Sequence, residues 1–258
     1  MTRIAGQQRT QGAWLAVAIL LVTPSATGKA RHDPAATQVE IQIALCSEPE
    51  KIVRALDLAP RGRSGDNWLF DDDALTLFEH GLRFRLRPVR GGSELTLKAA
   101  VDDCAGVPRE LVPAKAGKCE YDMHGETMTP SVSLTSHLDA SEVASLLSGK
   151  LPLAAALSAA QVRFLMESTN LWPLPLGLRP LGPIEVSSYR ARDLPYDVDV
   201  SRLPSGDRYV EVSRKVAVAD AATSRKTFDG DLARSGVTVC ADQSAQAVNK
   251  LRGLLRGH

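Results

Sequence analysis

The chain has 258 residues, with 31 lysines and arginines against 30 aspartates and glutamates and a formal charge of +1 at neutral pH. This balance, without a basic tail or a stripe of basic and aromatic residues, argues against nucleic acid as a partner. The length is sufficient for one substantial hydrophobic core, so we expect one domain.

The first thirty residues are typical of a cleavable secretory signal peptide. Arg3 and Arg9 form a positive region, residues 13–22 are ten apolar residues in a row, and small residues between 26 and 30 offer a cleavage site. Ten residues are too few to cross a bilayer core of about 30 Å; an uncleaved anchor or a buried helix is the alternative. Removal of residues 1–30 would leave 28 basic and 30 acidic residues, a formal charge of −2. We expect an exported protein, periplasmic or extracellular, without a stable membrane span after cleavage.

Four cysteines follow this segment, at Cys46, Cys104, Cys119 and Cys240. An even number in an exported chain predicts two disulfides. None belongs to a C-x-x-C pair, so zinc or thioredoxin-type chemistry is not expected. We favour Cys104–Cys119, which closes a local loop, with Cys46–Cys240 as the remaining pair. The spacing leaves the other two connectivities open.

Period-2 and helical patterns alternate along the mature chain, from a strand-rich half through a helical middle to a second strand-rich half. The predicted strands are 39–45, 68–70, 82–88, 94–100, 118–123, 184–189, 196–200 and 209–216. The predicted helices are 47–56 with Ser47 as cap, 73–80 with Asp72 or Asp73 as cap and Gly81 as stop, a helical stretch within 140–168, and 243–255. Residues 60–66 are expected to form a turn-rich loop. This order predicts an α+β fold with mostly antiparallel strands.

Charged residues alternate along four of these strands. Arg83, Arg85 and Arg87 share one face of 82–88, and the same pattern recurs in Glu94–Thr96–Lys98, Lys118–Glu120–Asp122 and Glu211–Ser213–Lys215. The simplest interpretation is that these charged residues form the solvent-exposed face of an ordinary antiparallel sheet. In a closed sheet the same face would line a polar lumen, where bases hold phosphate oxygens and carboxylates hold a divalent ion.

The strands between residues 70 and 98 carry a specific order of residues: Phe70-Asp71, Leu77-Phe78, Gly81, Arg85-Leu86-Arg87 and Thr96-Leu97-Lys98. This order resembles the signature of the CYTH superfamily, the triphosphate tunnel metalloenzymes. More loosely, Glu40 resembles the opening strand of that family, and Glu120 and Glu211 resemble its later strands. The resemblance implies a single CYTH-like domain over 31–258, an antiparallel eight-stranded tunnel with flanking helices and a helical insertion at about 140–168.

The resemblance also implies a triphosphate ligand and one or two Mg²⁺ or Mn²⁺ ions. Family members hydrolyse inorganic, thiamine or nucleoside triphosphates, or cyclise ATP. The implied anion-binding bases are Arg85, Arg87, Lys98, Lys118 and Lys215. The implied metal ligands are Glu40, Glu120, Asp122 and Glu211.

Several positions depart from the family pattern. Gln42 and Ala44 replace the second carboxylate and the lysine of the opening motif, and Ser213 replaces the second carboxylate of the late pair. Because hard divalent ions prefer several anionic oxygens, metal affinity is expected to fall. The sequence therefore favours an exported binder of a phosphorylated or other anionic small molecule, with a degenerate metal site. A metal-dependent triphosphate or polyphosphate hydrolase and a structural protein that keeps only the fold are the alternatives. We assign no catalytic residue, and the sequence carries no signal for an oligomeric state.

Overall fold

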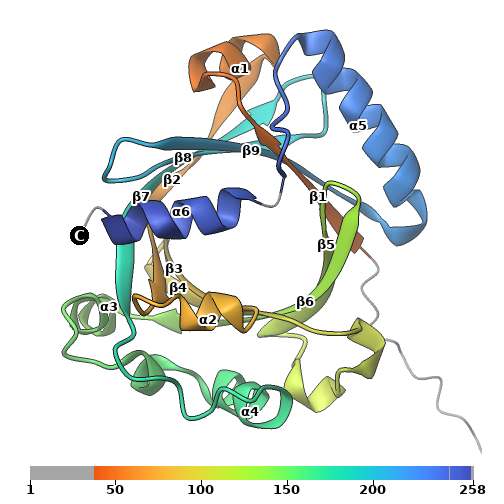
Figure 1. The fold of residues 1–258 in the computed structure, drawn as a ribbon. Helices are drawn as coiled ribbons and strands as arrows, with labels where there is room; N and C mark the ends of the chain where they lie inside the picture. The colour runs from red at the N-terminus through yellow and green to blue at the C-terminus, as the bar shows by residue number, and fades with distance from the viewer. Residues whose placement is uncertain (1–37, 244, 257–258) are drawn as a thin grey trace, which may run out of the picture. The chain divides into compact units, whose positions relative to one another are not determined.

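A closed β-barrel forms the centre of the protein in the computed structural model, which describes residues 38–243 and 245–256 (Figure 1). The strands of this described part are β1 (Gln38–Leu45), β2 (Leu58–Asp71), β3 (Leu82–Val89), β4 (Gly92–Ala100), β5 (Gly117–His124), β6 (Thr127–Leu138), β7 (Arg179–Ala191), β8 (Asp197–Arg202) and β9 (Arg208–Ala217). They close in the order β1-β5-β6-β4-β3-β2-β7-β8-β9. The predicted signal peptide lies outside the described residues.

Neighbouring strands of the barrel are antiparallel except for β1 and β5, which are parallel. The predicted, mostly antiparallel barrel with flanking helices is therefore confirmed. The described barrel has nine strands instead of the eight that the family resemblance implied. The difference is compatible with the same closed tunnel, since closure removes exposed sheet edges for any strand number.

The prediction of a loop over 60–66 was wrong, because these residues belong to β2. They pair with β7 on both sides of a register shift between Pro60 and Ser64. A bulge of this kind interrupts the two-residue alternation by which a strand is found in a sequence. Two further elements escaped prediction: β6, whose Ser and Thr residues mask its alternation, and helix α5 (Ala221–Ser235).

The apolar faces of the strands point out of the barrel, into two layers of helices (Figure 1). Helices α3 (Ala140–Leu147) and α4 (Ala159–Ser168) pack on the side chains of β3, β4 and β6. Helix α1 (Pro49–Ala55) and α5 pack on β1, β8 and β9. Because the core lies outside the barrel wall, the polar faces are left to line the lumen.

The caps of two helices differ from the predictions. Ser47 does not cap α1; its Oγ accepts a hydrogen bond from the backbone N–H of Thr238 at 2.7 Å. Helix α2 (Thr76–Glu79) is shorter than the predicted 73–80. Asp72 does receive the N–H of Thr76 at 2.9 Å, and Asp71 receives those of Leu77 and Phe78 at 2.9 and 3.1 Å. Asp73 instead pairs with Arg179 at 2.8 Å.

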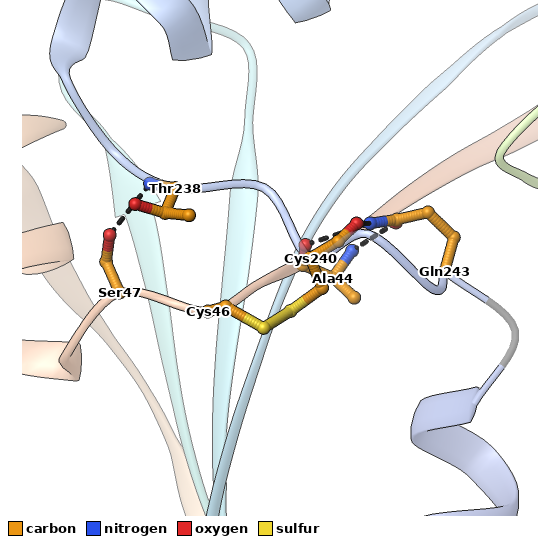
Figure 2. Close-up of a disulfide and its surroundings, with 6 residues drawn as sticks. All are labelled: Ala44, Cys46, Ser47, Thr238, Cys240 and Gln243. Carbon is orange, nitrogen blue, oxygen red and sulfur yellow. Dashed lines mark hydrogen bonds between the residues drawn. A yellow bond between two sulfur atoms is a disulfide. The ribbon is translucent and has the colours of Figure 1, made fainter.

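Both favoured disulfides, Cys104–Cys119 and Cys46–Cys240, are formed. The second joins the end of β1 to the segment that leads into helix α6 (Ala245–Arg256) (Figure 2). In the same segment the Gln243 side chain accepts the N–H of Ala44 at 2.7 Å and donates to its carbonyl at 3.2 Å. The C-terminal segment is therefore fixed to the barrel wall by a covalent bond and by hydrogen bonds.

Helix α6 lies across the opening of the barrel in the view of Figure 1. Its Leu251 and Leu254 are buried against a small apolar cluster from the barrel wall and its rim: Leu75, Leu181, Ile184 and Leu203. This contact closes part of one mouth of the lumen and brings the helix's polar face near the lumen. Within 38–243 and 245–256, no helix is long and apolar enough to cross a membrane.

Candidate anion and metal site

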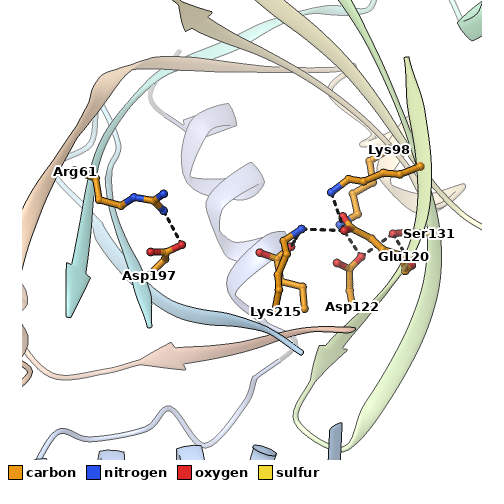
Figure 3. A network of polar contacts seen from close by, with 9 residues as sticks. Arg61, Lys98, Glu120, Asp122, Ser131, Asp197 and Lys215 are labelled. Atoms are coloured by element: carbon orange, nitrogen blue, oxygen red, sulfur yellow. Dashed lines mark hydrogen bonds and ion pairs between the residues drawn. The ribbon is translucent and has the colours of Figure 1, made fainter. Parts of the chain in front are cut away.

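The strand register gathers charged residues of distant strands on the inner surface of the barrel (Figure 3). Glu40 on β1 is paired in register with Asp122 on β5 and with Lys215 on β9. On the other side of β5, Lys118 and Lys98 both oppose Ser133 of β6. Residues paired in this way project from the same face of a sheet. The closed sheet thus turns the alternating charges inward.

Three carboxylates meet on this surface. Glu40, Glu120 and Asp122 each offer an oxygen within 4.8 Å of the other two. Glu120 and Asp122 are 7% and 5% exposed. Asp122 Oδ2 accepts a hydrogen bond from Ser131 Oγ at 2.8 Å, whereas Oδ1 is buried and has no hydrogen-bond partner in the described part of the chain. An oxygen of this kind is available to an added cation.

Three lysines neutralise these carboxylates. Lys98 Nζ lies 2.6 Å from Asp122 Oδ2, Lys118 Nζ lies 2.7 Å from Glu120 Oε2, and Lys215 Nζ lies 2.9 Å from that same oxygen. Burial by itself would raise the pKa of Glu120, but the bonds from the two lysines hold it below its ordinary value. Although burial acts in the opposite direction, the neighbouring carboxylates raise the pKa of Lys215. The contact between Glu120 and Lys215 therefore favours the charged form of both groups.

The carboxylate cluster could hold a metal ion, because hard divalent ions are bound by oxygens of this type and Asp122 Oδ1 is free to accept one. Glu40, Glu120 and Asp122 would be its ligands. When bound beside a phosphate chain, such an ion polarises phosphoryl oxygens and neutralises developing charge. The protein's own lysines would hold the phosphate oxygens in place.

The arginines of β3 line a different part of the lumen. Arg87 pairs with Glu94 of β4 at 2.5 Å, and Arg83 lies over the Phe78 ring at 5.7 Å. Arg85 has no ion pair with any carboxylate of the described residues, although water can reach its side chain. Burial within the barrel and the adjacent Arg87 lower the pKa of Arg85.

Glu211, the fourth predicted metal ligand, is not one of the three carboxylates that meet. It pairs in register with Asp199 and Ala44 on the inner surface. Burial raises its pKa, and the like charges of Asp199 and Glu40 add to that effect, while the largest opposing influence is Lys250 of α6. Glu211 therefore belongs to the lumen but lies beyond the cluster of three.

Two charged residues of the lumen, Arg61 and Lys250, were not predicted from the sequence. Arg61 pairs with Asp197 at 2.6 Å on the wall opposite the carboxylate cluster (Figure 3). It lies in the bulged part of β2, where no alternation marks a strand face. Lys250 lies 5.6 Å from the Tyr209 ring and 3.4 Å from Ser201 Oγ. It comes from a helix, and only the position of α6 at the barrel mouth brings it to this site.

No family model and no curated protein matches the sequence. Solved structures do match. A candidate adenylyl cyclase from Hippeastrum with a dominant triphosphatase activity has a TM-score of 0.55 and 14% identity, over 85% of this chain and 99% of that chain. A candidate adenylate cyclase from Bacillus halodurans has a TM-score of 0.50 and 16% identity, over 82% of this chain and 98% of that chain.

Identities this low establish the fold and nothing finer. A closed barrel whose charged faces point inward and whose apolar faces carry helices defines a tunnel protein. Its fold is the CYTH-like tunnel that the motif between residues 70 and 98 predicted.

Proposed function

We propose that this protein is exported and binds a phosphate chain or another polyanionic small molecule in the lumen of its barrel. The observation that carries the proposal is Arg85, whose guanidinium faces the lumen, is open to solvent and has no ion pair among the described residues. A solvent-accessible guanidinium that no carboxylate neutralises is free to bind an anion, and it matches phosphate oxygens in geometry and charge. A polyanion beside Arg85 would supply the missing partner.

The neighbouring bases support the same ligand. Lys98, Lys118, Lys215 and Arg87 lie around the lumen, each already paired with a carboxylate. Their lysine chains are flexible and carry three donors each, so they can share their protons with phosphate oxygens while they keep their carboxylates. A chain of phosphates is therefore a better fit than a single anion, because several cations are spread along the wall.

Export is supported by two features. The sequence of residues 1–30 has the organisation of a signal peptide, and the described chain forms two disulfides, which persist in oxidising compartments. An exported tunnel would meet polyanions outside the cytoplasm. We therefore specify the anion only by its chemical class, a phosphate chain or another polyanion.

The binding proposal is tested with tripolyphosphate as the probe. Titration calorimetry on the purified protein should show binding, and Arg85→Gln should weaken it by roughly 10- to 150-fold, the value of a charged hydrogen bond of about 1.5–3 kcal/mol. Arg90→Gln is the matched control, because Arg90 is exposed in the turn of the same hairpin. Equal affinity of the two variants would remove Arg85 from the site, and no binding by the unaltered protein would remove the proposal.

A second candidate function is metal-dependent hydrolysis of a triphosphate or polyphosphate, favoured by the free Asp122 Oδ1 beside two further carboxylates. Phosphate release from tripolyphosphate is measured with Mn²⁺ present. Loss of the rate in Asp122→Asn, with binding retained, would support this function. A rate that Asp122→Asn leaves unchanged would exclude it for this site.

A further inference from the structure

Lys215 occupies a particular place within the carboxylate cluster. Its Nζ lies 2.9 Å from Glu120 Oε2 (Figure 3). The same Nζ lies 3.5 Å from Glu40 Oε2, so the ammonium bridges two of the three carboxylates. Divalent ions bind carboxylate oxygens at about 2.0–2.6 Å. An ion shared by Glu40 and Glu120 would therefore enter the space that this ammonium fills.

The other two lysines each pair with a single carboxylate of the cluster. Lys118 binds Glu120 at Oε2 and Lys98 binds Asp122 at Oδ2. Asp122 Oδ1 stays without a hydrogen bond, and Lys215 is the cation that pairs with Glu40 among the described ion pairs. Removal of Lys215 alone would thus expose Glu40 and part of Glu120 next to an oxygen that already lacks a partner.

The charges lead to the same conclusion. Three carboxylates face three lysines, so the formal charges of the cluster cancel. A divalent ion that entered without an anion would create an excess of two positive charges in a partly enclosed site, which is unfavourable. The same lysine that neutralises the cluster would repel the incoming ion.

We infer that the Lys215 ammonium fills the place that a divalent ion would take. The tunnel therefore excludes free metal ions and binds its polyanion without a metal ion. This deepens the proposed function, on which it rests for the polyanion. The exclusion of free metal depends only on the residues of the cluster. Lys215 is in this sense the residue that decides between a metal-dependent and a metal-independent site.

The test is whether the protein binds Mn²⁺ in the absence of any other ligand. Binding is measured by titration calorimetry and by the change in melting temperature. The unaltered protein should show no binding in the millimolar range. Lys215→Met keeps the length of the side chain and removes its charge, and it should bind Mn²⁺ at least about tenfold more tightly and gain melting temperature with the ion. Lys226→Met is the control, because Lys226 is exposed on α5. Lys215→Gln repeats the test should the Met variant fold poorly.

Each outcome is decisive for the inference. Mn²⁺ binding by the unaltered protein that matches that of Lys215→Met would overturn it, since the ammonium would then exclude nothing. Absence of Mn²⁺ binding in both Lys215 variants would overturn it as well. Tripolyphosphate is titrated in parallel without metal. A failure there rejects the proposed function and leaves the result with Mn²⁺ alone unaffected, so the two ideas fail separately.

Discussion

The two sides of the lumen differ in how their charges are compensated. On β1, β5 and β9, Glu40, Glu120 and Asp122 each have an ammonium within 3.5 Å. On β3, Arg85 has no such partner in the described chain, and burial lowers its pKa. The first side is a network of ion pairs, and the second carries a cation without an ion pair, which under the proposed function is available to a ligand. Compensated and uncompensated charges are thus separated on one continuous wall.

The largest effect on stability is expected where the network is most buried. Lys98→Met leaves Asp122, whose side chain is 8% exposed, without its cation. Breaking a buried pair from one side costs about 3–5 kcal/mol, and the lower end applies here because Lys98 is partly exposed. Urea unfolding measures the loss. The double variant Lys98→Met/Asp122→Asn should recover much of it; a single variant as stable as the parent would show that the pair does not support the barrel.

A smaller loss is expected on removal of the shared carboxylate. Glu120→Gln leaves Lys118 and Lys215 without their common acceptor, but both can turn toward water, since their side chains are 53% and 41% exposed. We expect a loss of about 1–2 kcal/mol in the free energy of unfolding. Glu94→Gln, which breaks the more exposed pair with Arg87, should cost less than about 1 kcal/mol. Equal losses would contradict the difference drawn between the two sides.

The pH dependence of stability should distinguish Glu120→Gln from the parent. Lys118 and Lys215, acting against burial, hold the pKa of Glu120 below its ordinary value of 4.5. A depressed carboxyl pKa stabilises the folded state above the unfolded pKa, and this contribution is lost as the pH falls through the folded value. Melting temperatures of the parent and of Glu120→Gln should therefore converge as the pH falls below about 4.5. A constant gap down to about pH 3 would show that Glu120 is not held in this way.

The smallest effect on stability is expected for Arg85→Gln, the variant with the largest expected effect on ligand affinity. The substitution removes a poorly compensated cation, so stability should stay within about 0.5 kcal/mol of the parent or rise. Urea unfolding without ligand measures it beside Lys98→Met. A loss as large as that of Lys98→Met would mean that Arg85 is part of the stabilising network, and the two sides of the lumen would not differ as described.

The sequence by itself determined the features that depend on neighbouring residues. Strict alternation in 82–88 and 94–100 specified two strands with one charged and one apolar face, and Gly91-Gly92 specified the turn between them. The stop at Gly81, which has a φ of +70°, follows from glycine's tolerance of the left-handed region. The residue order of this block was also sufficient to predict the tunnel fold. Local geometry needs no knowledge of distant residues, so a pattern within one strand or turn is enough.

Only the tertiary structure decided which residues meet. Whether a charged face is wet surface or tunnel lining depends on closure of the sheet, a property of no single strand. The bulge in β2 hid Arg61, and the contact of α6 with the barrel mouth brought Lys250 to the lumen. Lys215 was predicted as an anion-binding base, and its place between Glu40 and Glu120 follows from pairing of β9 with β1 and closure through β5. The distances between these side chains depend on the register of strands that are far apart in the chain. The periodicity of the sequence within one strand does not predict that register.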